Sequence, residues 1–139
     1  MSMKRGFPFL ALFLLLCGGA FAAVQDFPKF KIDVPSDWTS SQAGPTVILI
    51  ANDKTASISI TVAPTEGAPL AELAKAFVNE LKGTDLAPES GGFSFTFKSG
   101  EAASRALLME NPDTKEYVLI AITGENPKVS QILGSLQDK

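Results

Sequence analysis

Three antiparallel strands are predicted by residues 92–123, which read GFSFTFKSGEAASRALLMENPDTKEYVLIAIT. Phenylalanine alternates with small or polar residues over 93–97, which is the period of a β-strand. Turn signals at 99–100 and 111–114 divide the stretch into three segments that can pair in succession. The stretch therefore predicts a meander with large rings on one side.

The turns also predict a pairing register. A two-residue turn between the first two strands sets Phe95 opposite Ser104, and a four-residue loop before the third strand sets Leu108 opposite Tyr117. The other side of the meander collects a second apolar set, so both faces of the sheet need a cover. This second set is Leu107, Met109, Val118, Ile120 and Ile122.

The rest of the chain predicts elements that supply this cover. Helical spacing of apolar residues predicts a helix over 69–82, followed by Gly83 as a stop, and a second helix over 126–136. Strands are predicted at 30–34, 46–51 and 57–62, and a loop is predicted at 84–92. Residues 23–139 are therefore expected to form one α+β domain. We expect a mostly antiparallel sheet of about six strands, covered by helices on both faces as an α/β/α sandwich.

Residues 1–22 have the pattern of a secretory signal peptide. A basic pair precedes an apolar run, and Ala-Phe-Ala at 20–22 forms a small-x-small cleavage site before Ala23. Two glycines interrupt the apolar run, which is shorter than the ~20 residues that a membrane-spanning helix needs. We therefore expect a periplasmic or secreted protein without a stable membrane span after cleavage. Lipid anchoring through Cys17 is the alternative, although Leu16 stands where a small residue is usual.

The composition of the remaining chain excludes several chemistries. The sequence has no histidine, and its single cysteine lies in the predicted signal peptide. Histidine-activated nucleophiles, thiolate or imidazole metal sites and disulfide bonds are therefore excluded from residues 23–139. The formal net charge is −3, and it becomes −5 when Lys4 and Arg5 are removed. Nucleic acid is not an expected partner, because an acidic protein repels it.

Residues 30–38, FKIDVPSDW, resemble the first strand of the PsbP-like superfamily, in which an alternating strand ends in proline and tryptophan follows after two residues. The predicted order of elements is similar to that superfamily over nearly all of residues 23–139. The superfamily includes the photosystem II extrinsic protein, a Ran-binding nuclear import factor and the DcrB-related bacterial envelope proteins. The resemblance implies an α/β/α sandwich that acts as a binding or accessory module, with no catalytic signature to transfer.

Two classes of function fit these observations. The first is a non-catalytic exported accessory or binding module, a monomer with no cofactor or metal, whose partner is a protein or a small ligand. The second is an envelope enzyme, such as a hydrolase, that uses carboxylates or lysine alone. The lack of side chains that ordinarily titrate near neutral pH favours the first class.

Four residues are candidates for contact with a partner. Trp38, Pro88 and Glu89 form the predicted partner surface, because exposed aromatic and loop residues often make contacts. Trp38 could instead cap one end of the sheet, with its N–H bonded to a loop carbonyl. Arg105, the only arginine after the signal peptide, could bind an anion or rest its stem over apolar neighbours at a sheet edge.

Carboxylates gather at two places. Glu110, Asp113 and Glu116 crowd one predicted turn and could bind calcium, but a solvated hairpin tip is favoured because no glycine bends the chain around an ion. Asp33 and Asp37 flank a proline bend, and no neighbouring residue type would orient one of them as a catalytic base. Neither set is predicted to be catalytic.

Signal cleavage predicts the mass of the exported protein. In the native host, the exported chain should begin at or near Ala23, because the small-x-small site precedes it. Intact-mass spectrometry of the exported protein measures this. A chain that begins at Met1 would contradict the prediction, and a lipid-modified Cys17 would establish the anchored alternative.

Overall fold

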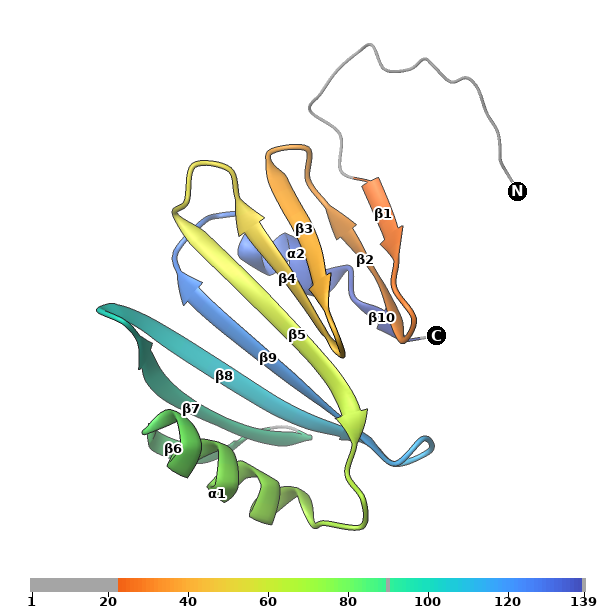
Figure 1. The fold of residues 1–139 in the computed structure, drawn as a ribbon, viewed down its shortest axis with the longest axis vertical. Helices are drawn as coiled ribbons and strands as arrows, with labels where there is room; N and C mark the ends of the chain where they lie inside the picture. Colours follow the sequence, from red (N-terminus) through yellow and green to blue (C-terminus); the bar gives the residue numbers. More distant parts are fainter. Residues whose placement is uncertain (1–22, 90, 139) are drawn as a thin grey trace.

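The computed structural model describes residues 23–89 and 91–138. They form two antiparallel sheets and two helices (Figure 1). The larger sheet has seven strands in the order β3-β4-β5-β9-β8-β7-β6, and the smaller sheet has three in the order β1-β2-β10. The predicted signal peptide and Cys17 lie outside the described residues. No helix in the described ranges is long and apolar enough to cross a membrane.

Both ends of the described chain belong to the smaller sheet. Its strands are β1 (Ala23–Asp26), β2 (Phe30–Val34) and β10 (Gln137–Asp138). The strands of the larger sheet are β3 (Trp38–Ala43), β4 (Thr46–Ala51), β5 (Ala56–Pro64), β6 (Thr84–Glu89), β7 (Gly92–Ser99), β8 (Ala102–Asn111) and β9 (Glu116–Gly124). The helices are α1 (Leu70–Leu81) and α2 (Val129–Gly134). A hydrogen bond of 2.8 Å from the Asp33 amide to Ser135 Oγ also links the two ends.

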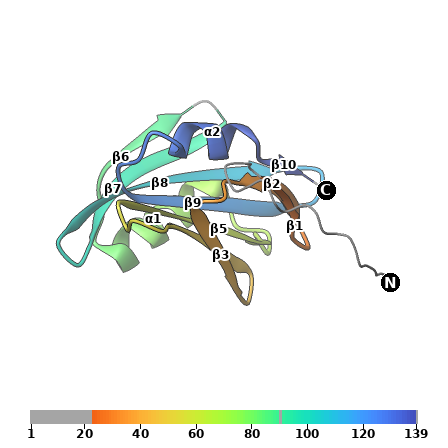
Figure 2. The same cartoon turned by 90° about the horizontal axis from the view of Figure 1, so that it is seen from above.

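The expected α/β/α sandwich is wrong, and so is the expected count of about six strands. The helices have 12 and 6 residues, too few to form a layer over a seven-stranded sheet. Helix α1 packs against β6, β7 and β8 on what we call the α1 face of the larger sheet. The opposite side, which we call the core face, is covered by residues of the smaller sheet and of α2, which packs against β2 (Figure 2). The protein is therefore a mostly antiparallel β fold with two accessory helices.

Two strands of the larger sheet were not predicted, because their residues lack an alternating apolar pattern. β3 reads WTSSQA, and Trp38 is its only buried side chain. β6 lies within the segment 84–92 that was expected to be a loop, and it carries Pro88. Both are edge strands, which tolerate polar residues and proline because only one side pairs. The second helix is shorter than predicted, because it ends at Gly134 and the chain enters β10.

The meander is confirmed as β7, β8 and β9, but its predicted register is wrong by two residues. The observed pairs are Phe95 with Ala106 and Leu108 with Leu119. The first turn is centred on Gly100 and Glu101, one residue later than predicted, and Gly100 has a φ of 65° that glycine adopts without strain. A shift of two residues leaves every side chain on its original face. The predicted sets of residues on the two faces are therefore correct.

The core face of the larger sheet holds the main hydrophobic core. Its buried side chains alternate along β4, β5 and β9, as expected for strands that bury one side. Residues of β2 and α2 close the core from the opposite side. The buried members are Phe30, Ile32, Val34, Trp38, Val47, Leu49, Ala51, Ala56, Ile58, Ile60, Ile120, Ile122 and Ile132.

A second, smaller core lies under α1. Phe95, Ala106 and Leu108 are at most 1% exposed on the α1 face. Phe77 of α1 meets Tyr117 of β9 edge-on, with ring centroids 5.5 Å apart, a favourable geometry for aromatic rings. The smaller sheet and α2 thus cover the β4, β5 and β9 part of the core face, and α1 covers the β6, β7 and β8 part of the other face.

The end of α1 shows why glycine follows the helix. Lys82 caps the helix in the left-handed conformation, with a φ of 56°. A Cβ atom on Gly83 would lie 2.9 Å from the Thr96 carbonyl oxygen and 2.8 Å from the Phe95 ring. Glycine therefore lets the chain that leaves α1 approach β7 closely, as the predicted stop required.

An ion pair joins the turn of the smaller sheet to the larger one. Lys29 Nζ, in the turn between β1 and β2, lies 2.8 Å from Glu116 Oε2 at the start of β9. The hydrogen bond from Lys29, with a further one from Thr114, holds the pKa of Glu116 below its ordinary value. The ionised carboxylate therefore favours the folded state.

The core under α1 predicts unequal losses in the free energy of unfolding when two of its phenylalanines are replaced by alanine. Phe95→Ala should lower the free energy of unfolding by about 3–5 kcal/mol, because it empties a fully buried ring site. Phe97→Ala, on the same face two residues later, should cost less because its ring is only half-buried. Urea unfolding of both variants measures the difference. Equal costs would contradict the described core.

The Lys29–Glu116 pair predicts a pH-dependent stability. A lowered folded-state pKa means that this carboxylate stabilises the fold above its unfolded pKa and that the contribution is lost as the pH falls through the folded pKa. Glu116→Gln should therefore lower the free energy of unfolding by up to about 1 kcal/mol at pH 7. This loss should shrink as the pH falls below 4.5 and vanish below the lowered folded-state pKa.

Urea unfolding at several pH values measures this loss. The control is Glu72→Gln, at the exposed pair of Lys75 and Glu72, whose atoms are 3.8 Å apart. Such a pair contributes little. A loss at Glu116 that is the same at every pH would show that packing, and not charge, is responsible.

Candidate functional site

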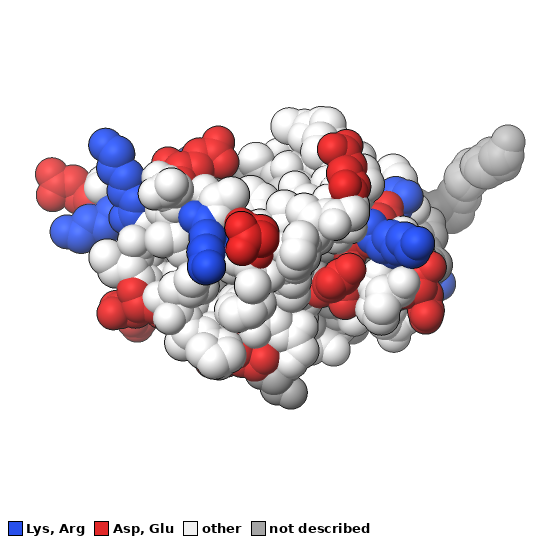
Figure 3. Space-filling model, turned by 90° about the horizontal axis from the view of Figure 1, so that it is seen from below, with Lys and Arg blue, Asp and Glu red and all other residues white. Residues whose placement is uncertain are grey.

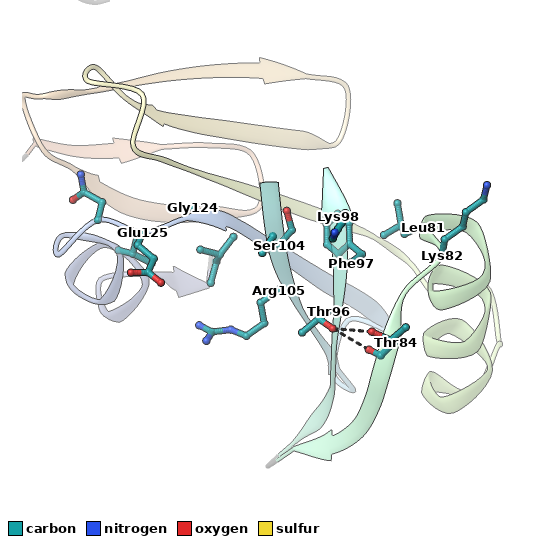
Figure 4. A pocket seen from close by; sticks show the side chains of 14 residues that line it. Leu81, Lys82, Thr84, Thr96, Phe97, Lys98, Ser104, Arg105, Gly124 and Glu125 are labelled. Carbon is teal, nitrogen blue, oxygen red and sulfur yellow. Dashed lines mark hydrogen bonds between the residues drawn. The ribbon is translucent and has the colours of Figure 1, made fainter. Parts of the chain in front are cut away.

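An open cleft with a volume of about 900 Å³ lies where β7, β8 and the end of β9 meet the segment that leads to α2 (Figure 4). We call it the Arg105 cleft. Its lining includes Thr84, Thr96, Ser104, Arg105, Ile122 and Glu125. The cleft lies beyond the part of the core face that the smaller sheet covers. It extends around the end of β7 and β8 to the α1 face, because Leu81, Phe97 and Ser104 also line it.

Arg105 reaches solvent because the cover of the core face ends at β8. One row of cross-strand neighbours crosses the sheet and changes from aliphatic to polar. From β5 to β6 the row is Ile58, Ile122, Arg105, Thr96 and Thr84. Ile58 and Ile122 are buried, whereas the last three are exposed. The smaller sheet and α2 thus determine where the polar part of the row begins.

The guanidinium group of Arg105 makes no hydrogen bond or ion pair with the other described residues. In Figure 4, the side chain extends from β8 on the same side of the sheet as Thr96 and Thr84. A guanidinium carries five N–H donors in a planar fork that can hold a carboxylate or phosphate through two hydrogen bonds. The expectation of an edge position is wrong, because β7 and β6 lie between β8 and the edge.

The neighbours of Arg105 add hydroxyl groups and two carboxylates, because Thr96 Oγ1 also donates a hydrogen bond of 3.4 Å to Asp85 Oδ2. The hydroxyl oxygens of Thr84 and Thr96 lie 3.1 Å apart and hydrogen-bond to each other. Glu125 lines the other border of the cleft, and its carboxylate forms no ion pair with Lys98 or Arg105 in the described part of the chain. Lys82 also lines the cleft, but Figure 4 shows its side chain directed away from Arg105. The cleft therefore presents donors to a ligand, without a contacting lysine–carboxylate pair.

The three residues of the predicted partner surface do not lie together. Trp38 is 5% exposed and packs in the main core, on edge strand β3. Pro88 and Glu89 are exposed on β6, the opposite edge strand. The predicted hydrogen bond from Trp38 to a loop carbonyl is wrong, because Nε1 is buried without a partner among the described residues. A partner surface at Pro88 and Glu89 stays a prediction.

The acidic residues singled out in the sequence are partly engaged in ion pairs. Glu116 pairs with Lys29, as described above. Asp37 Oδ1 accepts a hydrogen bond of 2.9 Å from Lys128 Nζ, whereas the Asp33 amide contacts Ser135. Within 23–89 and 91–138, no three acidic side chains are grouped closely enough to hold a metal ion.

The sequence singled out Arg105 but not the residues around it. The cleft combines side chains from four strands and from the segment after β9, which are distant along the chain. Only the cross-strand register brings Thr84 and Thr96 beside Arg105. The signal that could have found them is the change from aliphatic to polar residues along one cross-strand row, which can be read only once the strand order is known.

Comparisons with known proteins inform the fold alone. No family model and no curated protein matches the chain. Among solved structures, the chain is similar to a crystal structure from Bacteroides thetaiotaomicron VPI-5482, with a TM-score of 0.53 and 12% sequence identity. The match covers 79% of this chain and 45% of that one, so this chain spans less than half of that structure's length. The likeness supports the described β fold, and the resemblance to the PsbP-like superfamily stays a prediction.

Proposed function

We propose that this protein is an exported, non-catalytic binding module that holds an anionic group of its ligand in the Arg105 cleft. The observation that carries the proposal is the guanidinium of Arg105, which has no partner among residues 23–89 and 91–138 and lies on an interior strand at the border of the covered core. Arginine stays protonated at physiological pH, so it binds anions and does not act as a base.

The surrounding groups also support binding. Thr84 and Thr96 place hydroxyl groups next to Arg105 in the same cross-strand row. Hydroxyl and guanidinium donors together suit the oxygen atoms of a carboxylate or phosphate. Such a ligand would be held by hydrogen bonds. Among the described residues, Glu125 has no ion-pair partner with which it could act as an acid–base pair.

Recognition of an anion at this cleft has to be short-ranged. The chain is acidic overall, and on the face shown in Figure 3 the Lys and Arg side chains are interspersed with Asp and Glu. Long-range attraction of a polyanion is therefore weak, and screening by salt reduces it further. The proposed ligand is accordingly a compact anion or a molecule with one anionic group.

An NMR titration tests the proposal. Inorganic phosphate and succinate are the probes, and the backbone amides and the Arg105 Nε–H signal are followed. We expect saturable shifts centred on Arg105, Thr96 and Glu125. Arg105→Gln should weaken binding by about tenfold or more, because hydrogen bonds to a charged group are lost.

The matched control is Lys75→Gln, which removes one exposed positive charge from α1, outside the cleft. It should leave the affinity unchanged. Shifts that do not saturate, or equal weakening in both variants, would contradict an anion site at Arg105. A reproducible turnover that Glu125→Gln abolishes in a folded protein would contradict the non-catalytic proposal.

A further inference from the structure

The two sheets leave a crevice between them, at the end of the core away from the Arg105 cleft. It encloses about 250 Å³ and is lined from both sheets. A second hollow of about 140 Å³ shares four of its lining residues. The shared residues are Pro28, Lys29, Phe30 and Val62. The turn between β1 and β2 therefore lies over an incompletely filled part of the core.

The inner walls of the crevice are apolar. Phe30 and Ile60 are buried, and three further wall residues pack half-buried against the main core. These three are Val62, Val118 and Leu136. An apolar cavity of about 150 Å³ can stay free of water and bind benzene, because its walls offer water no hydrogen bonds. The crevice is larger than that, so its apolar inner walls have room for a ring or a short alkyl chain, while its border is polar and open to solvent.

The outer border of the crevice is polar but electrically balanced. Lys29 and Glu116 line it and neutralise each other in their ion pair. Asn111 Oδ1 accepts a hydrogen bond from the Asp113 amide, while its Nδ2 group makes none with the described residues. The border thus offers an amide donor and no unpaired charge. An uncharged polar group fits there, whereas an ionic head group would lack a counter-charge.

We propose that this inter-sheet crevice is a second binding site, which takes a small uncharged molecule with an apolar body. A single aromatic ring or a short alkyl chain occupies the walls formed by Phe30, Val62 and Val118. A hydroxyl or carbonyl group of the same molecule accepts a hydrogen bond from Asn111 Nδ2. The site is separate from the Arg105 cleft and does not depend on the function proposed above.

Binding of p-xylene to the purified exported protein tests the apolar part of the site. Methyl NMR should show saturable shifts at Val62, Val118 and Leu136, and the unfolding temperature should rise with ligand concentration. Val62→Phe should weaken binding by about tenfold or more, because Val62 lines both hollows and the larger ring fills them. Ile50→Phe is the control, since Ile50 is 41% exposed on the other face of the neighbouring strand β4.

Two outcomes would overturn the proposal. These are the absence of saturable methyl shifts, or equal weakening by Val62→Phe and Ile50→Phe. If Val62→Phe does not fold, Val118→Leu, which adds one methylene to the same wall, should still weaken p-xylene binding while Ile50→Phe does not.

A pair of probes tests the polar end of the ligand. 1-Hexanol should bind more tightly than hexanoate, because the border offers no unpaired positive charge. Asn111→Ala should weaken the binding of 1-hexanol and leave p-xylene unaffected. Tighter binding of hexanoate in the crevice would contradict an uncharged ligand, and hexanoate shifts that Arg105→Gln abolishes would assign that anion to the cleft instead.

Discussion

The packing of β2 onto the core face of the larger sheet is the interaction on which the rest of the structure depends. Phe30, Ile32 and Val34 cover aliphatic side chains of β4, β5 and β9. If that apolar surface were exposed to water, the folded state would lose about 25 cal/mol of free energy per Å². Helix α2 is too short to provide this cover alone. The smaller sheet is therefore the second layer of the core.

The mismatch in width between the two sheets creates the surface available for binding. The smaller sheet has three strands and the larger has seven, so part of the core face stays open. The open part starts in one cross-strand row, where buried Ile122 is followed by exposed Arg105 and Thr96. At the other end of the interface, the sheets separate around the turn between β1 and β2 and leave the inter-sheet crevice. Both sites follow from incomplete coverage of one face.

The local pattern of apolar residues was sufficient to predict much of the fold. The predictions that failed did so for physical reasons. Alternation of apolar residues predicted which side chains of β7, β8 and β9 share a face of the sheet. Helical spacing of apolar residues predicted α1. Both predictions succeeded because the period of the apolar residues indicates which side of an element is buried. The register failed because several turn positions suit the residues around Gly100. The α/β/α sandwich was wrong because the smaller sheet pairs distant segments, for which the sequence has no local signal. Exposure of Arg105 depends on where that cover ends, so it could not be predicted, whereas a Trp38 that caps one end of the sheet was one of the two expectations.

The joining of the two chain ends has a consequence for synthesis. The Ser135 hydroxyl that bonds to Asp33 of β2 is synthesised 102 residues after Asp33, and Ile132 of α2 follows β2 by a similar distance. A nascent chain therefore cannot close its main core until α2 has been synthesised. Pairing between ends so far apart is slow to form because its loop-closure entropy is large. If the chain is exported as its first residues predict, slow closure of the core favours the unfolded state that passage through a translocation pore requires.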